Sequence, residues 1–117
     1  MKRVKDKFYP AFSGVVDLIK TESSVRIQLI LGIGAVGVGY LLKFSYGEML
    51  VVGILAFVVI SMECCNTVIE WLVDAMYPEY NENAKRIKDG AAAMVLVASI
   101  GSMIIGGYIL IRNLFGG

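Results

Sequence analysis

Four polar residues lie at helical spacing inside an apolar stretch of this chain. The segment ECCNTVIEWLVD places them at i, i+3, i+7 and i+11: Glu63, Asn66, Glu70 and Asp74. In an α-helix these positions fall within roughly 80° of arc, at ~100° per residue. Ionisable groups at membrane depth are costly and commonly mark functional sites. The stripe therefore predicts a site on one face of a membrane helix.

The residue types in and near this stripe suit phosphoryl transfer. Carboxylate oxygens with an amide are suitable ligands for Mg²⁺, which usually takes one or two protein carboxylates together with substrate phosphates. A lysine beside them, such as Lys88 next to Asp89, can counter phosphate charge. The chain has no histidine, so acid–base chemistry falls to carboxylates or lysine. A carboxylate set deeper in the membrane is placed to act as a base toward a hydroxyl at headgroup level. We therefore expect transfer from a Mg–nucleotide to a lipid alcohol.

Several of these residues also have simpler interpretations. Asp74 at a helix end could be a solvated interface residue, and Glu22 could form a weak surface ion pair with Arg26 one turn away. Three basic residues could serve only as anchors on the positive side of the membrane: Arg26, Lys85 and Arg86. No comparably simple interpretation covers Glu63 and Glu70, because two carboxylates embedded in lipid need partners or a role.

The surrounding composition predicts helices that cross a membrane. The chain has 117 residues, of which 57% are hydrophobic, above the ~45–50% typical of soluble domains. A helix needs ~20 largely apolar residues to span the hydrocarbon core, and three stretches qualify: 27–44, 49–73 and 91–115. The adjacent thiols of Cys64 and Cys65, inside the second stretch, are interpreted as small buried hydrophobes rather than a disulfide or metal pair. We expect one all-α polytopic domain over residues 1–117.

The region before the first span has a different pattern. Between residues 1 and 24, apolar side chains such as Phe8 and Phe12 recur at near-helical spacing among lysines and aspartates. This pattern is typical of an amphipathic helix in the membrane interface, although a leader of mixed charge is an alternative. Most basic residues precede the first span or lie between the second and third: Lys2, Arg3, Lys5, Lys7, Lys20, Arg26, Lys85, Arg86 and Lys88. The bias predicts a cytoplasmic N-terminus and a cytoplasmic 74–90 loop.

The motifs together resemble those of the prokaryotic diacylglycerol kinase family, which includes undecaprenol kinases. The similarity is carried by ECCNTVIEWLVD, by the Lys88-Asp89 pair and by the small-residue run AAAMVLV that follows it. The segment AFSG and the positions of Glu22 and Arg26 agree as well. The likeness extends from about Phe8 to Gly107. It implies a homotrimeric lipid kinase of the bacterial cytoplasmic membrane, with three spans, an interfacial helix and active sites between subunits at the cytoplasmic face.

The resemblance also implies roles for individual residues. Glu63 would be the catalytic base that activates the lipid hydroxyl, and Asn66 would support that base and the γ-phosphate of ATP. Glu22 and Glu70 would hold Mg²⁺ on the ATP phosphates. Lys88 would contact the phosphates of the nucleotide, and its neighbour Asp89 would be an acidic residue of the same nucleotide site.

Two rival functions belong to other classes. A small proton-coupled transporter would also use intramembrane carboxylates, but it would favour four spans and a site near the midplane. A non-catalytic membrane assembly subunit gives no reason for Glu63 and Glu70. We expect ATP, a lipid alcohol and the membrane as partners, with no nucleic acid. The choice between diacylglycerol and undecaprenol stays open, as do the roles of Asp74 and Arg26.

Overall fold

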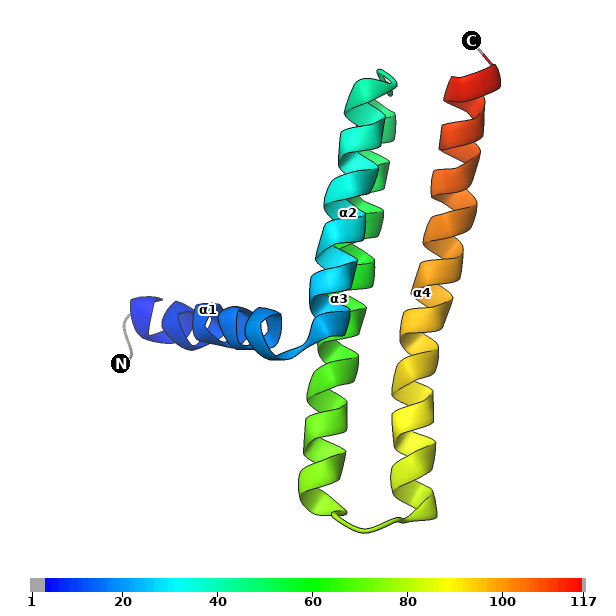
Figure 1. Ribbon diagram of the computed structural model, residues 1–117. Coiled ribbons are helices and arrows are strands. Elements are labelled where there is room, and N and C mark those ends of the chain that lie inside the picture. Colours follow the sequence, from blue (N-terminus) through cyan, green and yellow to red (C-terminus); the bar gives the residue numbers. More distant parts are fainter. Residues whose placement is uncertain (1–3, 117) are drawn as a thin grey trace.

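The computed structural model describes residues 4–116, and the ordered elements in this range are all helices (Figure 1). They are α1 (Val4–Thr21), α2 (Ser23–Leu41), α3 (Tyr46–Met76) and α4 (Glu82–Phe115). The all-α fold class is confirmed. The first three residues of the expected interfacial region 1–24 lie outside the described residues.

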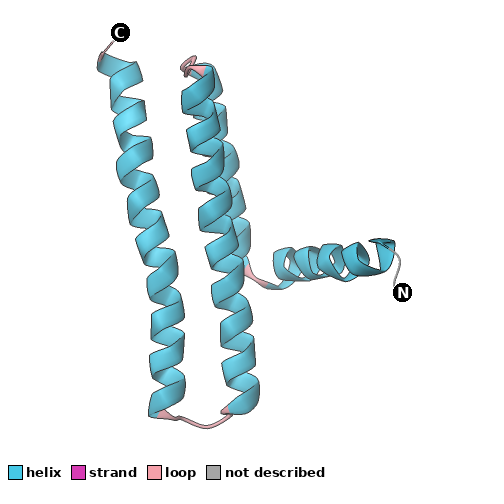
Figure 2. Ribbon diagram, turned by 180° about the vertical axis from the view of Figure 1, so that it is seen from behind, coloured by secondary structure: helices cyan, strands magenta, loops and turns pink. Residues whose placement is uncertain are grey.

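The three long helices run side by side, while α1 projects away from them. Helix α3 packs against both α2 and α4, and α1 contacts the start of α2. Figures 1 and 2 show from opposite sides that α1 leaves the bundle at a steep angle. The corner between α1 and α2 is the single residue Glu22, whose backbone is extended at φ −116° and ψ 114°.

Two of the three long helices exceed the length that crosses the hydrocarbon core of a membrane. Helices α2, α3 and α4 are long and apolar enough to cross one, which confirms the three expected apolar helices. At 1.5 Å per residue, the 19 residues of α2 measure ~28 Å, close to the ~30 Å hydrocarbon core. The 31 residues of α3 and 34 of α4 measure ~46 and ~51 Å. Figure 1 shows that both continue past the level of α1 to the loop that joins them.

Helix boundaries differ from the predicted spans where local backbone chemistry ends a helix. Helix α2 ends at Leu41, three residues before the end of the predicted 27–44 stretch, and Lys43 adopts a positive φ of 58°. The Phe44 N–H then donates to the Gly39 carbonyl at 2.9 Å. A Cβ on Gly39 would lie 2.7 Å from the Met49 sulfur and 2.8 Å from the Phe44 ring, so a larger residue there would force these side chains to shift.

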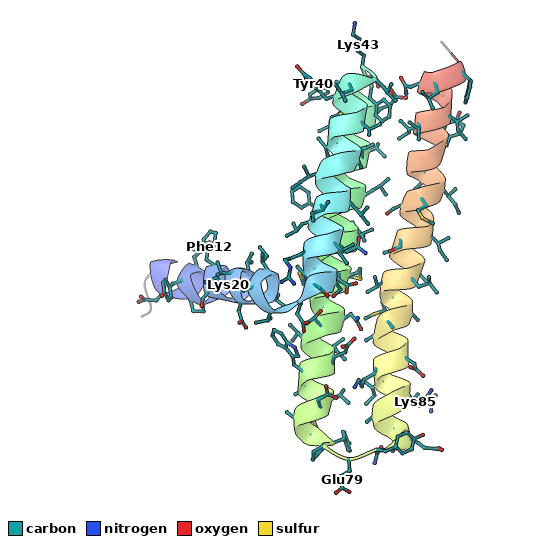
Figure 3. The ribbon with its side chains drawn as sticks, in the orientation of Figure 1. Phe12, Lys20, Tyr40, Lys43, Glu79 and Lys85 are labelled. Carbon is teal, nitrogen blue, oxygen red and sulfur yellow. The ribbon has the colours of Figure 1, made fainter. Side chains whose placement is uncertain are left out.

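Helix α3 begins earlier than the predicted 49–73 stretch because of a capping box. Ser45 is the N-cap; its side chain accepts from the Glu48 N–H, and the Glu48 carboxylate accepts from the Ser45 N–H at 2.8 Å. Asn113 of α4 donates to both Glu48 carboxylate oxygens at 3.2 Å. This contact joins α3 and α4 at the end marked by Lys43 in Figure 3, opposite to the Glu79 loop.

Few side chains are buried, and the outward faces are mostly apolar. Val25, at 2% exposed, is the most completely covered of the described side chains, whereas large apolar residues such as Phe57 remain 73% exposed. The adjacent thiols are both free, as expected of cysteines that form no disulfide, but Cys64 is only half-buried and Cys65 is exposed on this chain. Neighbouring helical residues point ~100° apart, so one of two adjacent side chains turns away from the packed face.

Candidate active site

The polar stripe on α3 passes from buried to exposed along the helix. Glu63 and Asn66 are each 8% exposed, Glu70 is half-buried, and Asp74 is exposed. Glu63, Asn66 and Thr67 are the buried polar side chains of the part of the chain that the structure describes. The helical periodicity read from the sequence therefore places the inner half of the stripe on the packed face of α3.

Glu63 is buried without a compensating partner. No hydrogen bond or ion pair reaches its carboxylate from any residue between 4 and 116. The nearby Thr67 hydroxyl donates instead to the Glu63 main-chain carbonyl, at 3.0 Å. An ionisable side chain without a partner in a long apolar helix is costly in a membrane and commonly marks a functional site. Glu63 is therefore the strongest candidate in the molecule for direct chemistry.

Asn66 is fixed on one side and unsatisfied on the other. Its Nδ2 donates to Glu70 Oε1 at 3.1 Å, one turn along α3. Its Oδ1 is fully buried and has no hydrogen-bond partner. A buried polar atom that lacks a partner is unusual in a native protein. The Asn66 oxygen is thus held in a defined direction and remains free to accept a hydrogen bond or a cation.

Glu22 approaches α3 from the corner between α1 and α2. It occupies the N-cap position of α2, yet its carboxylate makes no capping hydrogen bond. Glu22 Oε1 accepts instead from the indole Nε1 of Trp71 at 2.9 Å. Trp71 directly follows Glu70, so both carboxylates assigned to Mg²⁺ are tied to the same turn of α3.

The surface pair between Glu22 and Arg26, which was the simpler alternative for these residues, does not form. The Arg26 guanidinium donates to the main-chain carbonyls of Ile19 and Lys20, at 2.7 and 3.0 Å. These carbonyls belong to the last turn of α1, where helix C-termini carry partial negative charge and lack intrahelical donors. Arg26 therefore stabilises the end of α1 and the corner that presents Glu22.

Two lysines of α4 form ion pairs with aspartates near the loop. Lys88 Nζ lies 2.8 Å from Asp74 Oδ1, which connects α4 to α3, and Lys85 Nζ lies 2.7 Å from Asp89 Oδ2 on α4 itself. Figure 3 shows Lys85 pointing away from α3. The structure thus brings Lys88 to the end of the polar stripe and directs Lys85 to the outside.

The hydrogen bonds divide the acidic residues into two classes. Glu22 and Glu70 accept from neutral donors, an indole and an amide, which orient a carboxylate but leave its charge uncompensated. Asp74 and Asp89 are paired with lysines. Among residues 4–116, no three acidic, cysteine or histidine side chains are grouped so that they could enclose a metal by themselves. The two carboxylates with neutral donors, Glu22 and Glu70, offer oxygens of the kind that Mg²⁺ takes together with substrate phosphates.

An apolar cavity of about 600 Å³ lies between α2, α3 and α4. Residues from all three helices line it, including Gly32, Val59 and Met103. Val59 is one helical turn before Glu63, so the cavity reaches the neighbourhood of the buried carboxylate. The cavity therefore offers space for an apolar chain one helical turn from Glu63.

Sequence reasoning missed Trp71 and the pairing of Lys88 with Asp74. Trp71 is the one tryptophan of the chain and stands inside the polar motif. Its position next to Glu70 was the available signal. Its contact with Glu22, 49 residues away, follows from the α1–α2 corner, which the sequence pattern does not reveal.

Comparison with known proteins identifies relatives of this architecture. Residues 9–110 match the family model described as prokaryotic diacylglycerol kinase. The chain is 32% identical over 108 residues to a diacylglycerol kinase of Synechocystis sp., covering 92% of the chain and 62% of that relative. It is 29% identical over 114 residues to an undecaprenol kinase of Bacillus subtilis, covering 97% and 93%. The chain therefore spans less than two thirds of the Synechocystis protein and nearly all of the Bacillus protein.

Proposed function

Because the chain belongs to the prokaryotic diacylglycerol kinase family, we propose that it is a lipid kinase acting on a membrane lipid alcohol. The γ-phosphate of ATP is transferred to the lipid hydroxyl, with Mg²⁺ as the metal. The observation that carries this proposal is the buried, unpaired Glu63, which lies on the same face of α3 as a cluster of more exposed acidic residues. The two relatives are named for different lipids, so the acceptor is diacylglycerol or undecaprenol.

In the proposed reaction each polar residue has a separate task. Glu63 accepts the proton of the lipid hydroxyl, whose oxygen attacks the γ-phosphorus as the bond to ADP breaks. Asn66 supports Glu63 and the γ-phosphate through the second N–H of its Nδ2, because its Oδ1 can only accept. Glu22 and Glu70 hold Mg²⁺, which when bound neutralises charge on the ATP phosphates. The other two positions, Lys88 and Asp89, contact the nucleotide. Positioning and charge neutralisation then supply most of the rate.

The membrane arrangement follows from the charges and lengths of the helices. Helix α1 lies in the cytoplasmic interface, and the ends of α3 and α4 near residues 74–90 extend into the cytoplasm. Figure 3 supports this placement for α1, since Phe12 points to the side along which α2 runs. The exposed apolar faces of the long helices suit contacts with lipid and with two further copies in a homotrimer. The family gives no support to a proton-coupled transporter.

A direct assay tests the proposed reaction. Purified protein in detergent micelles with Mg–ATP is expected to phosphorylate diacylglycerol, undecaprenol or both, measured as labelled lipid from γ-labelled ATP. Triacylglycerol and undecaprenyl acetate, which lack the free hydroxyl, are the matched controls and should yield no product. Absence of product from both alcohols would refute the kinase proposal.

Glu70→Gln tests the metal-binding role. This change keeps the side-chain shape and an acceptor for Asn66 but removes the charge that holds Mg²⁺, so the midpoint of the Mg²⁺ titration of activity should rise by about tenfold or more. Glu79→Gln, in the exposed loop between α3 and α4, is the matched control and should leave the midpoint unchanged. An unaltered Mg²⁺ titration for Glu70→Gln would contradict its role as a ligand.

A further inference from the structure

Trp71 lies where it can control the position of a carboxylate on another helix. Its indole Nε1 donates to Glu22 Oε1 at 2.9 Å, across 49 residues of sequence. The indole is 40% exposed, and its one polar atom is used in this bond. Tryptophan has no other hydrogen-bonding group. The direction of the N–H therefore fixes one oxygen of Glu22 relative to α3.

The local backbone of Glu22 gives its side chain no other restraint. Glu22 lies in the one-residue break between α1 and α2, and its carboxylate does not cap α2. Arg26, one helical turn after Glu22, is committed to the carbonyls of Ile19 and Lys20, and no ion pair joins Glu22 to Lys20 among residues 4–116. A glutamate has three rotatable side-chain bonds, and ordering such a side chain costs entropy. Without Trp71, the carboxylate would sample several positions beside α3.

We propose that Trp71 is a positioning residue: its indole N–H holds the Glu22 carboxylate in place for the metal on the nucleotide phosphates. This inference rests on the proposed function, in which Glu22 and Glu70 share that metal. A neutral donor orients Glu22 without neutralising it, as Asn66 does for Glu70. In both carboxylates one oxygen accepts this protein hydrogen bond, and the other oxygen has no protein hydrogen-bond partner among residues 4–116. Hydrogen bonds that orient a metal ligand in this way commonly change metal affinity by about 10- to 100-fold.

Trp71→Phe is the variant that tests the proposal, because it keeps an aromatic ring and removes the N–H. Binding of Mn²⁺, with a non-hydrolysable ATP analogue present, is measured by electron paramagnetic resonance. The dissociation constant is expected to rise about tenfold, at the lower end of the usual range because the indole is partly exposed. The kcat at saturating metal should stay within about twofold. Tyr80→Phe, which removes a polar aromatic group that does not contact Glu22, should change neither quantity.

A double variant separates positioning from general stability. Glu22→Gln removes the ligand charge, so adding Trp71→Phe to it should weaken Mn²⁺ binding no further. Unchanged or tighter Mn²⁺ binding in Trp71→Phe, or additive losses in the double variant, would overturn the proposal. These outcomes leave the proposed function standing, provided that the wild type phosphorylates lipid and binds Mn²⁺ through Glu22.

A second measurement uses the fluorescence of Trp71 itself and therefore does not require the Trp71→Phe variant. Trp71 is the single tryptophan, so all tryptophan emission reports on this site. Mn²⁺ with the ATP analogue should quench that emission, and Glu22→Gln should require about tenfold more Mn²⁺ for the same quenching. Emission that is unchanged while Mn²⁺ binds would also overturn the proposal. A wild type without lipid kinase activity and without Mn²⁺ binding would remove the proposed function and this inference together.

Discussion

Glu63→Gln is expected to lower the rate of lipid phosphorylation by about 100- to 10,000-fold, the usual contribution of a general base. Glutamine has the same shape as glutamate but cannot take the proton of the lipid hydroxyl. The Glu63 side chain has no hydrogen-bond partner among residues 4–116, so the substitution breaks no contact within the described chain. The rate is measured as labelled lipid formed per minute in micelles at saturating Mg–ATP and lipid.

The second half of this experiment is the affinity for the nucleotide. Binding of Mg²⁺ with a non-hydrolysable ATP analogue should remain close to wild type, because Glu22, Glu70 and Lys88 are intact in the variant. Glu79→Gln is the control for an amide replacing a carboxylate at an exposed position. Full turnover by Glu63→Gln would exclude Glu63 as the base. Loss of nucleotide binding together with turnover would instead make Glu63 a ligand.

The polar stripe could be predicted from sequence because it depends only on helical periodicity. Glu63, Asn66 and Glu70 lie on one face of any α-helix that contains them, and α3 runs unbroken from Tyr46 to Met76. The gradient of burial along the stripe could be determined only from the structure. It depends on how α2 and α4 cover α3, which leaves Glu63 at 8% exposed and Asp74 in solvent.

Contacts between helices were the part that sequence reasoning could not supply. Glu22 and Arg26 are one turn apart, a spacing that suggested an ion pair, yet each forms hydrogen bonds with a different partner. The break at Glu22 turns α1 away from α2, exposing the last carbonyls of α1 to Arg26 and directing Glu22 toward Trp71. Spacing of three or four residues predicts side-chain pairs only within a continuous helix. The one-residue break at Glu22 interrupts the helix, so the prediction does not apply there.

The basic residues after the α3–α4 loop are a second case in which the sequence could not predict the partners of the side chains. Lys85, Arg86 and Lys88 look alike in sequence, as a basic group before the third apolar stretch. In the structure, α4 directs Lys88 to Asp74 on α3, whereas Lys85 bonds Asp89 on the outer face of α4. Two lysines that are three residues apart therefore have different partners and point to different sides of α4. The difference between them offers a matched test of which lysine serves the reaction.

Lys88→Gln is expected to lower phosphoryl transfer by about 100- to 1,000-fold, the usual loss when one preorganised donor to transition-state charge is removed. Lys85→Gln is the comparison variant, because it also removes a lysine from an ion pair at the same end of α4. It leaves Lys88 in place and removes only the partner of Asp89, so it should lower the rate by about tenfold or less. Loss of folding cannot account for such a difference. Lys85 and Lys88 are 62% and 38% exposed in their side chains, and exposed pairs contribute only about 0–1 kcal/mol each.

Asp74→Asn distinguishes a phosphate contact from a bridge between helices. If Lys88 mattered only as the partner of Asp74, removing the aspartate charge would reduce the rate as much as Lys88→Gln does. If Lys88 leaves Asp74 to meet the phosphates, Asp74→Asn should cost only about tenfold or less, because the lysine remains and has lost only an orienting partner. The rates of the three variants at saturating Mg–ATP are compared in one lipid. If Asp74→Asn and Lys88→Gln lower the rate equally, the ion pair has only a structural role between α3 and α4. If Lys85→Gln and Lys88→Gln lower the rate equally, both lysines act only through the general positive charge of this end of α4.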